Sequence, residues 1–465
     1  MRKRNKSLFI IVFFSLLFLI PIWSVRYVPL QDWPVFTGFS YIIAHLSHFS
    51  SFSVKPIPPP NTTGFLLLAG LMKVFPPLVA GKLLLSLYVV GFLGAFCYFL
   101  LVLNPKGLFL YFFAPLLTFN YFFAKGNINF ILSLPLFLFS VAFILPKIEK
   151  HGWRTIVITF LLSLTLYFTH LFTYCAFLLV LLVFVICRKR GMYLFAAAVV
   201  PACLCMTYFI TNRAPLELEF YKSFAVKFIS FRDTFGTWTP YLDVALLSIP
   251  FIALLVLVVR GWKNTELAWK IILASFLVLF ILSPMEVYTL VRADQRFLPF
   301  MFFVLLVFPN YKNNLRFSKL LVALLVILSL ANFTIKEIGF LSLQPRMERC
   351  ITALSMVPEN KSVVSMGTKE YYIGVINPFL HIIAYEVSLK GNANIPPYDW
   401  KAPVYYTERF PVPVINEGII KNKYELCAFY DFFFLMEEST TMESQIQDFA
   451  ELVFIDNETK LFKRK

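Results

Sequence analysis

Charged residues are scarce in this chain of 465 residues. They make up 15% of it, against about a quarter in an ordinary soluble domain. Acids are the scarcer sign, with 26 Asp and Glu against 42 Lys and Arg, while hydrophobic residues supply 59% and the mean hydropathy is +0.74. These values exclude an ordinary soluble domain and, over most of the length, a disordered chain. The composition predicts an integral membrane protein.

Cysteine and glycine are also sparse. The seven Cys show no CxxC spacing, which argues against a metal or disulfide framework. Cys350 and Cys427 are the only pair in the polar tail, and they either bond in an oxidising compartment or stay free thiols. The counts of 17 Gly and 28 Pro exclude a collagen-like or low-complexity chain.

Long apolar runs predict eleven transmembrane helices, the first of them an uncleaved signal-like helix. The predicted spans are 8–23, 76–103, 108–124, 127–146, 155–169, 171–187, 192–211, 241–260, 266–284, 296–309 and 319–340. With the N-terminus in the cytoplasm, the cytoplasmic loops hold sixteen Lys and Arg against two acids, Glu149 and Glu266. The positive-inside rule therefore places the C-terminus outside, and it explains the net charge of +16 without a nucleic-acid partner.

The polarity changes after residue 340. We expect a transmembrane bundle over 1–340, with an outer loop over 24–75, and a small extracytoplasmic α/β domain over 341–465. In the loop, 64–75 is too short to span and is expected to be an interfacial helix. In the tail we expect helices at 347–356, 379–390 and 442–449, strands at 362–366 and 426–435, and a hairpin at 451–462.

Asp32 is the most informative single position. It is the lone acid of the first outer loop, beside an expected interfacial Trp33. A partly desolvated carboxylate at a membrane surface can accept a proton from an attacking hydroxyl. The alternative is a helix N-cap, because Pro34 suits the first turn of a helix.

Other candidates lie on the same outer face. His45 and His48 are one turn apart and suit a metal or an anion, although no third ligand is evident by spacing and no metal is indicated. His170 suits either a phosphate or a backbone carbonyl. Lys125 precedes a Gly-Asn turn that forms either an anion site or a plain helix–turn–helix.

Two further groups complete the candidates. Arg292 and Arg296 suit either a bidentate phosphate clamp or snorkelling to headgroups. In the tail, the polar residues expected to face a substrate are His381, Tyr385, Glu386 and Asp399. For His381, the alternative is an ordinary surface histidine.

Several short motifs together resemble the GT-C superfamily of integral-membrane glycosyltransferases and a group of bacterial membrane proteins within or near it. The motifs are Gln31-Asp32-Trp33-Pro34, Gly126-x-x-Asn129-Phe130, Thr169-His170, Arg296-Phe297-Leu298-Pro299 and Phe379-Leu380-His381. The resemblance implies a GT-C-like fold in a bacterial inner membrane. It also implies inverting transfer of a sugar from a polyprenyl-phosphate donor to a hydroxyl of a glycan, lipid or protein acceptor.

On this resemblance, Asp32 is the catalytic base. The substrate contacts are assigned to His170, Lys125, Arg292, Arg296, His45 and His381. Phe36 or Thr37 stands where that bacterial group tends to carry a His, and no second acid lies close to Asp32. The first departure leaves a role for that His open unless His45 replaces it, and the second favours a metal-free mechanism over a metal-dependent one.

Two other functions stay open. One is a lipid or solute transporter or flippase, which would bury ionisable residues within its spans. The other is a non-catalytic scaffold. The spans are nearly free of charge in the sequence, which favours chemistry at the membrane surface. Three glycosylation sequons leave a eukaryotic secretory membrane as the alternative location.

Overall fold

The computed structural model describes most of the chain. The described residues are 2–49, 52–55, 59–149, 152–212, 218–221, 223–287, 290–309, 315–359, 361–367, 372–391, 404–406, 411, 413–416, 419–436 and 440–465. Asp399, one of the predicted substrate-facing residues, lies outside them.

Helices dominate the described residues. They are α1 (Arg2–Ser24), α2 (Trp33–Ala44), α3 (Thr63–Met72), α4 (Pro77–Leu103), α5 (Phe113–Thr118), α6 (Tyr121–Lys125), α7 (Ile128–Ile144), α8 (Trp153–Thr169), α9 (Leu171–Arg188), α10 (Met192–Asn212), α11 (Phe224–Asp233), α12 (Pro240–Gly261), α13 (Leu267–Leu282), α14 (Phe297–Leu305), α15 (Leu315–Ser355), α16 (Tyr385–Lys390), α17 (Lys423–Phe429) and α18 (Thr440–Gln447). The strands are β1 (Phe52–Val54), β2 (Leu218–Glu219), β3 (Glu286–Val287), β4 (Leu290–Val291), β5 (Val363–Gly367), β6 (Val404–Tyr406), β7 (Ile415–Asn416), β8 (Ile419–Ile420), β9 (Phe432–Met436), β10 (Ala450–Asp456) and β11 (Thr459–Arg464).

Six helical segments among the described residues are long and apolar enough to cross a membrane. They are Pro77–Leu103, Pro105–Lys125, Ile128–Lys147, Leu171–Arg188, Pro240–Asn264 and Lys319–Ser355. The five other predicted spans correspond to shorter apolar helices, such as Trp153–Thr169 and the nine-residue α14. The structure thus supports a helical membrane protein with six candidate spans, and not the predicted count of eleven.

The chain divides into two compact units. The bundle unit comprises Met1–Ile20, Leu87–Phe122 and Asn129–Lys336, and the mixed unit comprises Pro21–Ser86, Phe123–Ile128 and Glu337–Lys465. The mixed unit therefore contains the whole of the first outer loop, residues 24–75, which was expected to group with the bundle.

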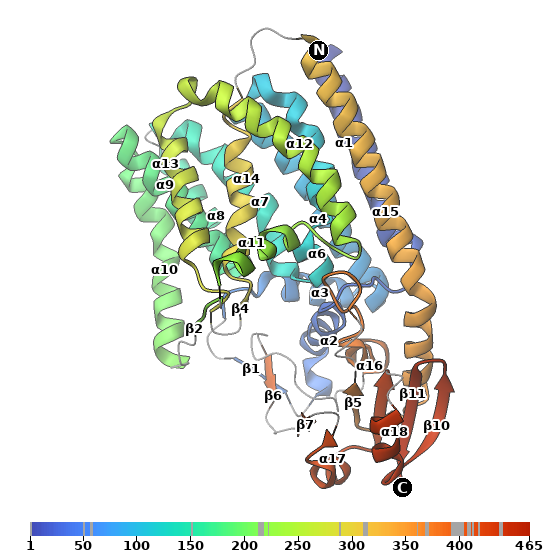
Figure 1. Cartoon of the computed structure of the whole chain (residues 1–465). Coiled ribbons are helices and arrows are strands. Elements are labelled where there is room, and N and C mark those ends of the chain that lie inside the picture. Colours follow the sequence, from blue (N-terminus) through green and yellow to red (C-terminus); the bar gives the residue numbers. More distant parts are fainter. Residues whose placement is uncertain are drawn as a thin grey trace. The chain divides into compact units, whose positions relative to one another are not determined.

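In the bundle unit, α8, α9 and α10 pack side by side, and α13 packs on both α9 and α14 (Figure 1). His170 separates α8 from α9 because its backbone is extended, with φ −162° and ψ 114°. Phenylalanine fills much of the interior, where Phe92, Phe137 and Phe300 are buried. Such rings bury large apolar areas and often meet edge to face, as Phe122 and Phe130 do at a centroid distance of 4.5 Å.

In the mixed unit, α2 packs against α3 and α16. Gly38 allows the contact with α16, because a Cβ at this position would lie 3.3 Å from the carbonyl oxygen of Ala384. Trp33 is buried in this unit and lies against Gly81. The expectation of an interfacial Trp33 is therefore wrong, since this ring fills space within the fold.

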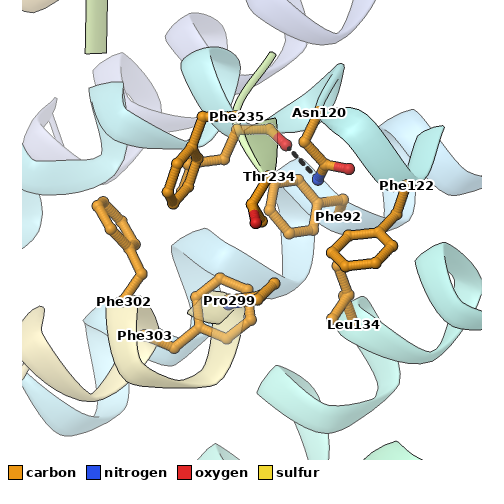
Figure 2. Close-up of a pocket in the computed structure, with 10 residues that line it drawn as sticks. Phe92, Asn120, Phe122, Leu134, Thr234, Phe235, Pro299, Phe302 and Phe303 are labelled. Atoms are coloured by element: carbon orange, nitrogen blue, oxygen red, sulfur yellow. Dashed lines mark hydrogen bonds between the residues drawn. The ribbon is translucent and has the colours of Figure 1, made fainter. Parts of the chain in front are cut away.

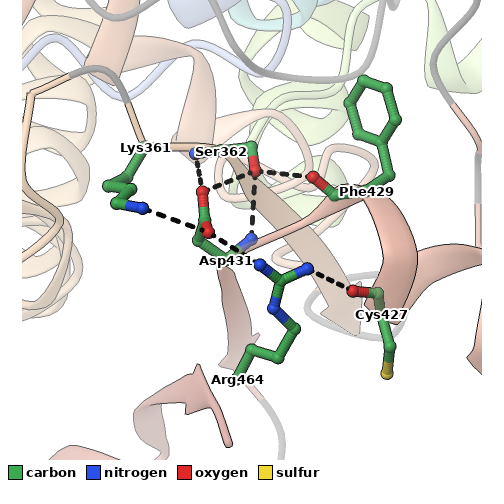
Figure 3. A network of polar contacts seen from close by, with 6 residues as sticks. All are labelled: Lys361, Ser362, Cys427, Phe429, Asp431 and Arg464. Atoms are coloured by element: carbon green, nitrogen blue, oxygen red, sulfur yellow. Dashed lines mark hydrogen bonds and ion pairs between the residues drawn. The ribbon is translucent and has the colours of Figure 1, made fainter.

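The C-terminal sheet has the order β10-β11-β9-β5, antiparallel except for the parallel pair β5 and β9. All five residues of β9 are buried, as expected for a strand covered on both faces. At the edge of the sheet, Asp431 accepts hydrogen bonds from the backbone and hydroxyl of Ser362 and forms ion pairs with Lys361 and Arg464 (Figure 3). Asp431 thereby ties the start of β9 to the start of β5 and the end of β11.

Several predicted tail elements are confirmed, including the strand at 362–366 and the hairpin turning at Asp456 and Asn457. Residues 426–429 are wrong as a strand, because they belong to α17. The predicted helix at 347–356 is part of α15, which continues through Pro345. A proline removes one helical hydrogen bond, and neighbouring turns carry the helix across this position.

Candidate functional site

The backbone of Asp32 is held by the end of α6. The amides of Gln31 and Asp32 donate to the carbonyl oxygens of Ala124 and Lys125, at 3.1 and 2.9 Å. Gly126 makes this approach possible, because its φ is +82° and a Cβ there would lie 3.0 Å from the backbone nitrogens of Asp32 and Trp33. The predicted tight turn at Gly126 is confirmed, and its role is to position Asp32.

The carboxylate of Asp32 is not used as a helix cap. Asp32 occupies the N-cap position of α2, with Pro34 in the first turn, yet its side chain makes no capping hydrogen bond. Its Oδ1 instead lies 3.9 Å from Lys125 Nζ and 3.7 Å from His381 Nε2, and one third of the side chain is exposed. The mixed unit thus assembles three of the predicted site residues from three separate segments.

His381 reaches Asp32 because its segment is fixed by Gln31. The amide of Asn377 donates to Gln31 Oε1 at 3.0 Å, and Asn377 Oδ1 accepts from the amide of Phe379 at 3.1 Å. Neither Gln31 nor Asn377 was predicted as a site residue. The sequence carries no spacing signal for them, since they are 346 residues apart.

Burial lowers the pKa of His381 below 6.5. The negative charge of Asp32 opposes this shift, and the positive charge of Lys125 adds to it. His381 is therefore neutral near pH 7 and can accept or donate a hydrogen bond. The interpretation of His381 as an ordinary surface histidine is wrong, because its side chain is only 18% exposed.

This geometry suits proton transfer from a hydroxyl. Separations of 3.7 and 3.9 Å are longer than a hydrogen bond but too short for an atom to fit between the groups, so a hydroxyl would reach Asp32 from its exposed side. A charged carboxylate is the form that acts as a base, and the Lys125 ammonium lies 3.9 Å from it. The three residues can therefore bind an acceptor hydroxyl and remove its proton.

In the bundle unit, His170 and Arg296 form a buried pair. Arg296 Nη1 lies 3.1 Å from His170 Nε2, and both residues are at most 4% exposed. A guanidinium only donates, so Nε2 accepts and the ring carries its proton on Nδ1. The guanidinium also lies 5.5 Å from the ring centroid of Phe122 and 5.1 Å from that of Phe130.

The bundle unit also contains a small apolar pocket (Figure 2). Its free interior is about 20 Å³, which is room for about one water molecule. The lining residues are Phe92, Leu117, Asn120, Phe122, Leu134, Thr234, Phe235, Pro299, Phe302 and Phe303. Phe122 belongs both to this lining and to the rings around Arg296, so a buried cation lies next to a hydrocarbon-lined space.

Arg292 and Arg296 make different contacts. Arg292 pairs with Asp233 at 3.7 Å and lies 4.4 Å from the ring of Tyr121, whereas Arg296 contacts His170. These contacts give no support to a joint clamp. Arg292 has a φ of 55°, which is strained for a residue with a side chain.

Between these arginines in sequence, Asp294 is fully buried. Its Oδ2 lies 3.9 Å from Lys227 Nζ, and Tyr221 donates to its Oδ1 at 3.3 Å. Burial raises the pKa of Asp294 and lowers that of Lys227, and each charge opposes the shift of the other. This ion pair, which the sequence did not reveal, fixes the loop that precedes α14.

A second buried ion pair joins α12 and α15. Lys336 of α15 contacts Asp243 of α12, and Asp243 also accepts from the backbone of Thr237 at 2.7 Å. Lys336 and Asp243 are 1% and 5% exposed. The predicted spans containing them are thus not free of buried charge.

The remaining candidates show little sign of metal chemistry. His45 and His48 stack with ring centroids 5.9 Å apart, and no group of three or more His, Cys, Asp or Glu suited to a metal occurs in the described part of the chain. All seven cysteines are free, including Cys350 and Cys427.

Comparison with protein-family models and with characterised proteins finds no match to this chain.

Proposed function

We propose that the protein is an inverting glycosyltransferase of the GT-C type. In this proposal an eleven-span bundle lies in a bacterial cytoplasmic membrane, with the N-terminus inside and the C-terminal domain outside. It transfers a sugar from a polyprenyl-phosphate donor to a hydroxyl of a glycan, lipid or protein acceptor. The resemblance of the short sequence motifs supplies the family.

The observation that carries the proposal is the environment of Asp32. An N-cap carboxylate that makes no capping bond, is one-third exposed, and faces an imidazole and an ammonium within 4 Å suits a general base. Gln31, Gly126 and Asn377 hold this arrangement through backbone contacts. Such support is typical of sites that must keep a fixed geometry.

The bundle unit supplies features suited to a lipid phosphate. Arg296 and the Nδ1–H tautomer of His170 form a buried hydrogen-bonding pair. A guanidinium can bind two phosphate oxygens. We assign the donor phosphate to Arg296 and His170.

The reaction balances without a redox partner. The acceptor oxygen forms a bond to the anomeric carbon as the bond from that carbon to the phosphate oxygen breaks. Asp32 takes the hydroxyl proton, and polyprenyl phosphate leaves with the electron pair. General-base help of this kind contributes about 10²- to 10⁴-fold in rate.

The test compares two Asp-to-Asn changes in proteoliposomes that contain a polyprenyl-phosphate sugar and an acceptor mixture. We expect Asp32→Asn to reduce sugar transfer at least about 100-fold while the protein still binds the donor. Asp448 is exposed on the tail and provides the matched control Asp448→Asn, which should transfer normally. Equal transfer by wild type and Asp32→Asn would refute Asp32 as the base.

A lipid flippase is the second candidate, and the buried pair of Lys336 and Asp243 favours it. Ionisable groups within membrane spans often mark transport pathways. The same proteoliposomes distinguish the two functions. A flippase moves labelled polyprenyl-phosphate sugar between leaflets without breaking it, and Lys336→Met would stop that movement, whereas a transferase releases free polyprenyl phosphate.

A further inference from the structure

Four ring side chains gather where α2 ends, in the mixed unit. Tyr41 and His45 have centroids 4.3 Å apart, and His45 and His48 stack at 5.9 Å with an interplanar angle of 29°. Phe49 meets Tyr41 edge-on at 6.2 Å. We call Tyr41, His45, His48 and Phe49 the α2 ring cluster.

The cluster is open to ligand yet held in place. His48 is exposed and the other three side chains are half-buried. The amides of His48 and Phe49 donate to the carbonyls of His45 and Leu46, and Phe49 contacts the buried Phe52 of β1. Since β1 pairs with β6, the cluster rests on ordered backbone, and a preorganised surface loses little freedom on binding.

The rings offer both apolar faces and polar edges. His45 Nδ1 lies 3.1 Å from the carbonyl oxygen of Tyr41, and because a carbonyl accepts, Nδ1 carries the proton and Nε2 can accept from a ligand in the neutral ring. None of the four members is a lysine or arginine, so the cluster is a poor anion site. With two imidazoles it also falls short of a typical protein metal site.

We propose that the α2 ring cluster is a binding site for a neutral saccharide. The C–H face of a pyranose packs on aromatic rings, and its hydroxyls pair with imidazole nitrogens and the Tyr41 hydroxyl. Interfacial aromatic belts of membrane proteins consist mainly of Trp and Tyr, whereas this cluster contains two histidines. That composition favours a sugar over a lipid headgroup.

The position of the cluster indicates an extended ligand. Asp32 precedes one end of α2 and the cluster lies at the other, and a helix of 12 residues with a rise of 1.5 Å per residue spans about 18 Å. A sugar chain that presents a hydroxyl to Asp32 while resting on the cluster must be an oligosaccharide. This step rests on the proposed function, whereas sugar binding by the cluster does not.

Binding is measured on the whole protein in nanodiscs prepared without glycoside detergents. The probes are maltohexaose, cellohexaose and chitohexaose, with glucose for comparison. We expect at least one hexasaccharide to bind more tightly than glucose and to shift the ring proton resonances of His45 and His48. We expect His48→Ala and Tyr41→Leu each to weaken binding about three- to tenfold.

Two further variants serve as controls. His48→Phe keeps the ring face and should regain much of the affinity lost in His48→Ala. Tyr424 is exposed on α17, away from the cluster in sequence, and Tyr424→Leu should bind normally. If no hexasaccharide binds, or if lipid-borne nitroxides broaden the His48 resonances while sugars leave them unchanged, the site is a membrane contact and the proposal is wrong.

The result separates this inference from the proposed function. Hexasaccharide binding that depends on His48, in a protein that transfers no sugar, would support the cluster and count against the enzyme. Sugar transfer without hexasaccharide binding at the cluster would support the enzyme and count against the cluster as a binding site.

Discussion

At the scale of single residues, the candidate site depends on where side chains point rather than on which residues are present. Asp32 has the sequence context of an N-cap, and its backbone does occupy that position. Its carboxylate nevertheless faces Lys125 and His381. The sequence could identify all three residues as candidates but not that they meet, because Lys125 and His381 come from segments about 90 and 350 residues further along the chain.

The titration of His381 provides a direct test of this cluster. We expect its pKa to lie below 6.5, to rise in Lys125→Met as a like charge is removed, and to fall in Asp32→Asn as an opposite charge is removed. The measurement is a proton NMR titration of the histidine rings, assigned with His381→Gln. Shifts in the same direction in both variants would contradict the arrangement.

Asp431 makes a second prediction at this scale. Burial alone would raise its pKa, but hydrogen bonds from Ser362 and the charge of Lys361 outweigh burial and lower it. Its contribution to stability is therefore complete above the unfolded pKa of about 4 and is lost as the pH falls through the lower folded value. Asp431→Asn should lower the free energy of unfolding of the sheet at pH 7 by about 1–3 kcal/mol. In this variant the free energy of unfolding should no longer contain the pH-dependent contribution of Asp431.

Hydrogen exchange of the β5 and β9 amides between pH 6 and pH 3 measures the effect of Asp431. Asp448→Asn is the control, because that exposed side chain lies outside the network shown in Figure 3. If hydrogen exchange in Asp431→Asn depended on pH as it does in the wild type, other carboxylates would be responsible for the loss of stability in acid.

At the scale of elements, apolar runs and turn residues were the reliable signals. They located α4, α7, α9, β5 and the β10–β11 hairpin. They failed where contacts between distant segments determine the secondary structure. Residues 426–429, which are apolar and aromatic, belong to α17 instead of a strand. They also could not show that α2 packs on α16, because the two helices are more than 300 residues apart in sequence.

Gly126 links element geometry to the site. A side chain here would strain a φ of +82° and approach the backbone of Asp32 within 3.0 Å. We expect Gly126→Ala to destabilise the mixed unit by about 1–3 kcal/mol and to lower sugar transfer at least about tenfold with Asp32 intact. Transfer assays in proteoliposomes and thermal unfolding together measure this effect.

Gly70 of α3 provides the control for Gly126. A Cβ at Gly70 would meet nothing within 4 Å, so Gly70→Ala should be neutral or should stabilise by about 0.5–1 kcal/mol. If Gly126→Ala also behaved in this way, the turn would not be what positions Asp32.

At the scale of the whole molecule, hydropathy could predict a helical membrane protein with a polar tail, but not which segments fold together. The first outer loop and residues 123–128 belong to the same compact unit as the tail. Helix α2 buries most of its surface, including Trp33, Val35 and Phe39. Nothing in the local hydropathy of α2 indicates which part of the chain covers it.

This organisation predicts the effect of removing the tail. A chain ending at residue 340 would lose α16 with its Val387 and the preceding Ala384, which lie against Gly38. It would also lose Asn377, whose amide donates to Gln31. The apolar runs of the bundle would still insert, because each long span meets the length requirement by itself. The first outer loop should lose its cover and become accessible to protease.

Limited proteolysis of inside-out and right-side-out vesicles measures this effect. We expect cleavage within 24–75 to be at least about tenfold faster in the truncated protein than in the full chain. A decrease of about 1.4 kcal/mol in the free energy of local opening raises the population of the open, cleavable state tenfold. Ala384→Trp, which would crowd the contact with Gly38 in the full chain, should accelerate cleavage in the same region. Equal cleavage rates in the full and truncated chains would mean that the loop folds without the tail, and that α2 is covered by residues before 340.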